Sequence, residues 1–315
     1  MESLEQKDIR GALNEKEGFQ IWWRLLRPHT LTASFVPVLI GTTLAALDYQ
    51  VRFELFLAML VASMLIQSAT NMFNEYYDYV RGLDNENSVG IGGTIVRDGI
   101  SPKTVLGLAL SFFAVAIILG IYISISSSWW IALIGMISML CGFLYTGGPY
   151  PIAYTPFGEL FAGFFMGTVI IGISYYIQAS TITGSVVLVS IPIALLIGTI
   201  LLSNNIRDLD GDKENGRKTI AILLGRKKAR NLLGSLFAIS YLLTVGYVVI
   251  GMIPIWSLLT FLSLKKARDA YQGFKHKTMP IDMMPAMKAT AQTNTFYGLL
   301  LGLSLLIQLL YPLSF

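Results

Sequence analysis

The sequence predicts an all-α, polytopic membrane protein with about nine transmembrane helices, and three observations lead to this fold class. Of the 315 residues, 54% are apolar and only 13% are charged, whereas an average soluble domain carries about 25% charged residues. The mean hydropathy is +0.62. The apolar residues are gathered into long runs with few charges, of the length that a helix needs to cross a bilayer. A soluble core does not require such runs.

Each predicted span is one of these apolar runs. In chain order the spans cover residues 29–49, 55–77, 104–125, 129–146, 158–178, 185–206, 231–251, 253–271 and 289–311. The eighth is the weakest, because its apolar part is short and it ends in Lys265, Lys266 and Arg268. Residues 1–20 are polar and mixed in charge, so we expect a cytoplasmic tail without a cleavable signal peptide, followed by one membrane domain at 21–315.

The basic residues are distributed unevenly between the two sides of this layout. The odd-numbered loops contain Arg52 alone, and the other 22 of the 23 Lys and Arg residues lie in the N-terminal segment and at the even-numbered loops. The positive-inside rule therefore predicts a plasma-membrane protein with a cytoplasmic N-terminus and an external C-terminus. The net charge of +4 does not require a nucleic-acid partner, and we expect none.

The spans form an internal repeat of two parallel four-helix sets. The pseudo-repeats cover about 29–146 and 158–271, each with an acidic motif at the cytoplasmic end of its second helix, and the final helix at about 289–311 is left over. Parallel repeats also occur in transporters, so the repeat alone does not identify an enzyme.

The two acidic motifs share the spacing Asn-x-x-x-Asp. The first is N-E-Y-Y-D-Y-V-R-G-L-D at 74–84, and the second is N-N-I-R-D-L-D-G-D at 204–212, 130 positions later. Residues four apart on a helix share a face. The pairs that share a face in this way are Asn74 with Asp78, Asn204 with Asp208, and Asp208 with Asp212.

Upstream, Gln67 and Asn71 extend the stripe of Asn74 along one face of an otherwise apolar helix. Because lipid offers amide groups no hydrogen-bonding partners, we expect this polar seam to face the interior of the bundle. Ionisable residues at a membrane edge are by default hypotheses of function.

Two groups of carboxylates that face one another repel unless a cation lies between them. Mg²⁺ takes oxygen ligands and is commonly held by one or two carboxylates together with substrate phosphates. We therefore expect a cradle for two Mg²⁺ ions that bridge to a diphosphate. Its expected ligands are Asn74, Asp78, Asp84, Asn204 (or Asn205), Asp208 and Asp212, with Glu75 in reserve and Asp210 undecided. Two histidines and one cysteine are too few for a zinc site.

Basic residues close to both motifs suit the remaining phosphate oxygens. The glycine-rich stretch at 90–94 is expected to offer backbone N–H groups to the same anion. The expected contacts of the substrate are Arg81, Arg97, Arg207, Arg217, Lys218 and Asn205.

Four stretches resemble the UbiA superfamily of intramembrane prenyltransferases, and the resemblance covers nearly the whole chain. They are R-P-H-T-L at 27–31, the motif at 74–84, Y-T-G-G-P-Y-P at 145–151 and N-N-I-R-D-L-D-G-D-K-E-N-G-R-K-T at 204–219. Within the superfamily the chain is most similar to members that use 1,4-dihydroxy-2-naphthoate in menaquinone biosynthesis. It departs from the family pattern at Glu75, where members often have Asp, and in the longer gap between Asp78 and Asp84.

The resemblance implies an aromatic prenyltransferase that needs Mg²⁺, with Asp78, Asp84, Asp208 and Asp212 as catalytic residues. A polyprenyl diphosphate would lose its diphosphate, and an electron-rich aromatic carbon would attack the allylic carbocation. In 1,4-dihydroxy-2-naphthoate the attacked carbon carries the carboxylate, so CO₂ leaves and demethylmenaquinone forms. Tyr145 is expected to stabilise the cation with its ring. Arg27 would face the diphosphate or the carboxylate of the acceptor.

Three alternatives stay open at this point. Another aromatic acceptor, such as 4-hydroxybenzoate, heme or homogentisate, fits the same motifs. A cation-coupled transporter would also contain a repeat, but it places charged groups near the midplane of the membrane rather than at one face. A CDP-alcohol phosphotransferase would bind Mg²⁺ and a diphosphate, but through one aspartate-rich signature rather than two distant motifs.

Overall fold

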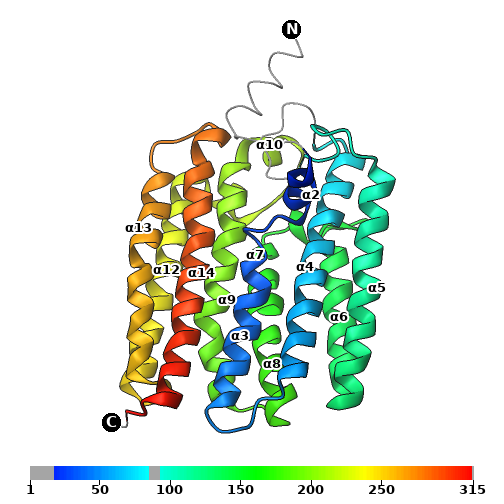
Figure 1. The fold of residues 1–315 in the computed structure, drawn as a ribbon. Helices are drawn as coiled ribbons and strands as arrows, with labels where there is room; N and C mark the ends of the chain where they lie inside the picture. Colours follow the sequence, from blue (N-terminus) through cyan, green and yellow to red (C-terminus); the bar gives the residue numbers. More distant parts are fainter. Residues whose placement is uncertain (1–17, 85–92, 314–315) are drawn as a thin grey trace.

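The computed structural model describes residues 18–84 and 93–313, and these residues form helices and no strands (Figure 1). Seven helical segments in the described part are long and apolar enough to cross a membrane. They are α4 (Phe53–Val80), α5 (Pro102–Ser126), α6 (Trp129–Thr146), the composite segment Gly158–Ala179, α9 (Gly184–Arg207), α12 (Arg226–Val249) and α14 (Pro280–Leu310). The long helices lie side by side in one bundle (Figure 1). The predicted fold class is confirmed.

The first predicted span is shorter in the structure, because a turn separates two helices. The amphipathic helix α2 (Phe19–Leu26) ends at Arg27, whose φ of 51° lies in the left-handed region. Arg27 precedes Pro28, and a residue before proline is disfavoured in the right-handed helical conformation. The apolar helix α3 (Thr32–Ala46) begins only after this turn. The turn brings Arg27 to the end of the bundle where the acidic motifs lie.

The eighth predicted span is divided into two parts. A 3₁₀-helix, η3 (Ile255–Ser263), leads into α13 (Leu264–Gly273), and neither is long enough to cross a bilayer alone. The hydroxyl of Thr260 donates to the carbonyl of Ser257 over 2.7 Å, and that of Ser263 donates to Thr260 over 2.6 Å. Side-chain bonds to the backbone at this three-residue spacing compete with the α-helical pattern and suit a 3₁₀-helix.

The segment Gly158–Ala179 consists of α7 (Gly158–Ala162), the π-helical turn η2 (Gly163–Val169) and α8 (Ile170–Ala179). It packs closely on α9 through small residues. A Cβ atom on Gly163 would lie 2.5 Å from the carbonyl oxygen of Ala194, and one on Gly167 would lie 2.6 Å from the Ala194 Cα. The absence of side chains at both glycines therefore permits this approach.

The C-terminal ends of α4 and α9 lie at the same end of the bundle, next to α2 and α10 (Leu209–Glu214) (Figure 1). The short elements η1 (Ile152–Tyr154) and α11 (Ile220–Leu224) lie in the connections that precede α7 and α12. Both acidic motifs therefore lie at the same end of the bundle. The pseudo-repeat boundaries themselves stay a prediction.

Candidate active site

The first acidic motif ends α4 in a turn that folds the chain back. Gly82 has a φ of 71°, and glycine adopts this conformation without steric cost. The amide of Leu83 donates to the carbonyl oxygen of Asp78 over 2.9 Å, and the amide of Asp84 donates to the same oxygen over 3.3 Å. This Schellman turn returns Asp84 towards Asp78. Burial, and next the Asp78 carboxylate, raise the pKa of Asp84 to about 6.

The second motif runs from the end of α9 into α10, and a turn of the same kind follows α10. The amide of Asp212 donates to the carbonyl oxygen of Asp208 over 2.8 Å, across the junction of α9 and α10. Gly216 has a φ of 75°, and the amide of Arg217 donates to the carbonyl of Asp212 over 3.0 Å. The turn thus carries Arg217 back over Asp212. Burial, which Arg217 only partly opposes, raises the pKa of Asp212 to about 6.

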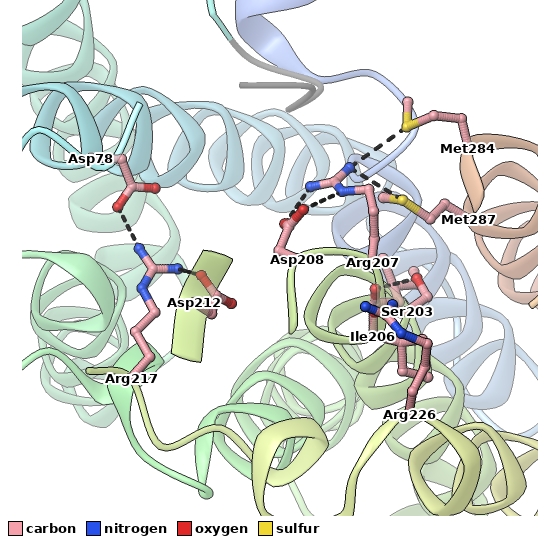
Figure 2. Close-up of polar contacts among 11 residues, drawn as sticks. Asp78, Ser203, Ile206, Arg207, Asp208, Asp212, Arg217, Arg226, Met284 and Met287 are labelled. Atoms are coloured by element: carbon pink, nitrogen blue, oxygen red, sulfur yellow. Dashed lines mark hydrogen bonds and ion pairs between the residues drawn. The ribbon is translucent and has the colours of Figure 1, made fainter. Parts of the chain in front are cut away.

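Arg217 joins the two motifs directly. Its Nη2 lies 2.8 Å from Oδ1 of Asp78, and its Nη1 lies 3.0 Å from Oδ1 of Asp212, so that its guanidinium stands between the two carboxylates (Figure 2). The guanidinium also lies over the ring of Tyr154, 4.7 Å from its centroid. Burial opposes the charge of Arg217, but the two carboxylates raise its pKa above the ordinary value.

Asp208 forms an ion pair with a different arginine, Arg207. Arg207 donates from Nε to Oδ1 of Asp208 over 2.6 Å and from Nη2 to Oδ2 over 2.5 Å. The side chain of Arg207 is buried, and its Nη1 lies 3.2 Å from the sulfur of Met287. Figure 2 draws this contact as a dashed line. This fork-like geometry is the strong bidentate form of the arginine–carboxylate pair. It holds Asp208 at the end of α9.

In the described part of the chain, no three side chains of Asp, Glu, His or Cys converge tightly enough to hold a metal ion. The carboxylates of Asp78, Asp208 and Asp212 form ion pairs with Arg207 and Arg217. Arg27 and Arg81 also lie close enough to act on Asp78, and Asp84 adds a fourth carboxylate beside it. Every candidate donor atom is an oxygen. This donor set fits Mg²⁺. The ligand roles of Asn74, Asp78, Asp84, Asn204, Asp208 and Asp212 stay predictions, and they require the arginines to share carboxylate oxygens with the metal.

A cavity of about 590 Å³ opens next to the motifs. At one end it is lined by Arg27, Asn74, Tyr145 and Asn204. The rest of its wall is mostly apolar and includes Met59, Ile66, Ile131, Phe165, Met166 and Ile197. Met59 and Asn74 both lie on α4, roughly 22 Å apart at a rise of about 1.5 Å per residue. The cavity is therefore long, polar at the motif end and apolar along the helices.

The polar seam on α4 faces this cavity, as predicted. Gln67 and Asn71 are buried and line the cavity together with Asn74. The side-chain amide of Asn71 donates to Oγ1 of Thr30 over 2.9 Å, which fixes α4 against the turn that follows α2. Oδ1 of Asn74 accepts a hydrogen bond from Thr146 over 2.7 Å.

The remaining predicted contacts of the substrate occupy different environments. Arg97 is buried, with its guanidinium 2.4 Å from where a Cβ of Gly93 would lie. The side chain of Lys218 is exposed, while its backbone amide donates to the carbonyl of Tyr154 over 2.8 Å. In the glycine-rich stretch, only Gly93 and Thr94 belong to the described residues. The phosphate contacts of Arg97 and Lys218 stay predictions.

Two acids have roles that the sequence did not reveal. Glu75 is buried, accepts the backbone N–H of Ile95 over 3.1 Å and lies 3.8 Å from Arg27. It therefore ties α4 to the segment before α5 and to the cavity. Glu159, in the first turn of α7, accepts from the side-chain amide of Asn205 over 2.8 Å. Glu159 is the single acidic residue in an otherwise apolar predicted span, and this isolated charge indicates in the sequence that the residue has a specific partner.

Asp210, undecided from the sequence, lies at the surface of the site. Its side chain is 73% exposed and pairs with Arg226 over 2.8 Å. It therefore differs from Asp208 and Asp212, whose side chains are 38% and 10% exposed.

Arg81 donates to the carbonyl oxygens of Thr146 and Gly148 and lies against the rings of Tyr77 and Tyr154. We expect Arg81→Gln to destabilise the protein by at least about 1.5 kcal/mol, because two charge-assisted hydrogen bonds are lost. Thermal unfolding in detergent tests this. Arg81→Lys keeps the positive charge but lacks the two guanidinium nitrogens that donate to the two carbonyl oxygens, so it should recover only part of the lost stability. A higher KM for the diphosphate at unchanged stability would instead support the phosphate contact predicted from the sequence.

Comparison with known proteins places this chain in a family. Residues 34–278 match the UbiA prenyltransferase family. The chain is 58% identical over 288 residues to the 1,4-dihydroxy-2-naphthoate octaprenyltransferase of Bacillus subtilis (strain 168), covering 91% of this chain and 93% of that protein.

Solved structures share the fold at low sequence identity. The apo structure of a UbiA homolog from Aeropyrum pernix K1 has a TM-score of 0.67 at 16% identity, covering 90% of this chain and 98% of that one. A UbiA homolog from Archaeoglobus fulgidus bound to GPP and Mg²⁺ has a TM-score of 0.61 at 15% identity, over 89% and 99%. This chain is a multi-pass membrane protein that belongs to the UbiA prenyltransferase family.

Proposed function

We propose that this protein transfers a polyprenyl chain from polyprenyl diphosphate to 1,4-dihydroxy-2-naphthoate, with loss of diphosphate and CO₂, to give demethylmenaquinone in menaquinone biosynthesis. The structural observation that carries the proposal is Arg217, which holds Asp78 of one half 2.8 Å away and Asp212 of the other 3.0 Å away. The choice of acceptor rests on the 58% identity to the Bacillus subtilis enzyme of that name.

The charged residues of the site would bind the diphosphate of the prenyl donor, the metal and the carboxylate of the acceptor. Arg207 and Arg217 would hold the diphosphate at the ends of α9 and α10, and Arg27 would face the diphosphate or the carboxylate of the acceptor. Asp78, Asp84, Asp208 and Asp212, with Asn74 and Asn204, would hold Mg²⁺. When bound, Mg²⁺ would supply Lewis-acid stabilisation of the charge that grows on the departing diphosphate.

The apolar part of the cavity suits the isoprenoid chain, which is insoluble in water. Side chains such as Met59, Ile131 and Phe165 line it. Tyr145 lines the cavity, as Asn74 and Asn204 do, and its ring would face the allylic carbon as positive charge develops. An apolar wall also keeps water from that carbon until the aromatic acceptor attacks it. We infer that the site faces the cytoplasm, from the distribution of Lys and Arg among the loops.

The acceptor is tested with purified protein, Mg²⁺, a polyprenyl diphosphate and a panel of aromatic acids, with products identified by mass spectrometry. We expect prenylation of 1,4-dihydroxy-2-naphthoate in preference to 4-hydroxybenzoate and homogentisate. With a ¹⁴C-labelled carboxylate on the naphthoate, one labelled CO₂ should appear for each prenylated product, since attack occurs at the carbon that carries the carboxylate. A product that keeps the carboxylate, or preferential prenylation of another acid, would refute the assignment.

A further inference from the structure

A second hollow lies on another side of the bundle from the cavity. It is a groove of about 510 Å³ between α12 and α13, two helices at the opposite edge of the bundle from α5 and α6 (Figure 1). It is lined by residues of α12 from Asn231 to Tyr241 and of α13 from Leu264 to Tyr271. None of these residues lines the 590 Å³ cavity. The proposed reaction therefore makes no use of this groove.

One end of the groove carries a polar cluster built around Tyr271. The Tyr271 hydroxyl donates to Oδ1 of Asn231 over 3.2 Å, and the guanidinium of Arg230 lies over the Tyr271 ring, 5.1 Å from its centroid. A Cβ on Gly234 would lie 2.9 Å from Cδ2 of Tyr271, so glycine at this position lets the ring lie against α12. Arg268, one turn before Tyr271 on α13, lines the groove at this end.

The cluster is positively charged and has unused donors. Within the described residues neither Arg230 nor Arg268 forms an ion pair with a carboxylate. The Nε of Arg230 is buried and has no hydrogen-bond partner in the described part of the chain. Lys265 and Lys266, also on α13, add charge close by. Cations on a membrane helix are costly unless something compensates them, so this end of the groove fits an anion.

The rest of the groove is apolar except for Ser235. Phe237, Ala238 and Tyr241 on α12 and Leu264 and Ala267 on α13 form its walls. A ligand that matches the whole groove has a negatively charged head and an apolar tail. A second copy of the chain fits less well, because a symmetric contact through this face would bring like charges together. We propose that the groove binds an anionic phospholipid, with its phosphate at Arg230 and Arg268 and an acyl chain between α12 and α13.

Native mass spectrometry of the delipidated full chain in detergent tests the proposal. The probes are phosphatidylglycerol and phosphatidylcholine with identical acyl chains. We expect at least about tenfold greater retention of phosphatidylglycerol, because each arginine near the headgroup favours the anionic lipid. The double variant Arg230→Gln/Arg268→Gln should retain the two lipids equally. Lys103→Gln, which removes an exposed charge on α5, should behave as the unaltered protein.

A steric variant separates the acyl-chain site from surface charge alone. Ala238→Leu fills the apolar part of the groove from an exposed position without changing any charge, so it should also reduce phosphatidylglycerol retention. Prenyl transfer by these variants should stay within about twofold and so reports that they are folded. Equal retention of both lipids by the unaltered protein, full retention by the double variant, or loss of a dimer in place of loss of lipid would overturn the proposal.

Discussion

Removal of divalent cations with EDTA is expected to abolish prenyl transfer, and Mg²⁺ in excess over the chelator is expected to restore it. The reason lies in the charge of the site. The carboxylates of Asp78, Asp84, Asp208 and Asp212 already offset the charges of the arginines around them, and a substrate diphosphate would add further negative charge. Without a divalent cation this repulsion should prevent the diphosphate from binding productively.

The measurement is formation of prenylated naphthoate at a series of free Mg²⁺ concentrations. As a control, the protein should show unchanged secondary structure in EDTA, because ion pairs with Arg207 and Arg217 hold the carboxylates of Asp78, Asp208 and Asp212 in the absence of metal. Prenyl transfer that continues at full rate in EDTA would contradict the metal-binding roles of the two motifs.

Asp208→Asn is expected to lower kcat at least about tenfold, and by up to about a thousandfold if the metal that this carboxylate would hold supplies most of the stabilisation of the departing diphosphate. Asparagine keeps the size of the side chain and one acceptor oxygen but removes the charge that Arg207 pairs with and that the metal would use. Asp78→Asn, in the other half of the protein, should have an effect of the same order. Turnover of detergent-purified variants at saturating Mg²⁺ gives the comparison.

Asp210→Asn is the matched control, because Asp210 belongs to the same motif but is 73% exposed and pairs with Arg226 at the surface. Surface ion pairs contribute little, so this variant should keep its activity within about twofold. Equal losses for Asp208→Asn and Asp210→Asn would mean that the motif acts through its overall charge rather than through defined ligands.

Much of the fold follows from the sequence because membrane helices must satisfy their own backbone and expose apolar side chains. The seam of Gln67, Asn71 and Asn74 was placed correctly for the same reason, since amides avoid lipid. The turn at Arg27 and Pro28 was missed, although the restriction on a residue before proline was a local signal. The break at Ser263 depends on hydroxyls that bond to their own backbone, which hydropathy does not register.

The arrangement of the charges could not be predicted in the same way. Spacing along α4 and α9 indicated which aspartates share a face, but not that Schellman turns at Gly82 and Gly216 would return Asp84 and Arg217 to the site. Arg81 and Arg217 look alike in sequence as basic residues near an acidic motif. Only the tertiary structure shows that Arg81 bonds to backbone carbonyls while Arg217 joins the two carboxylates.

A structure of the protein with Mn²⁺ in place of Mg²⁺ and a non-reactive polyprenyl diphosphate analogue, with the metal located by anomalous scattering, would test whether both motifs hold one metal-bound diphosphate. We expect metal density between the ends of α4 and α9, with ligand oxygens from both motifs and from one diphosphate, and the isoprenoid chain in the cavity lined by Met59 and Phe165. Metal held by one motif alone, or a diphosphate bound away from Arg217, would contradict this expectation.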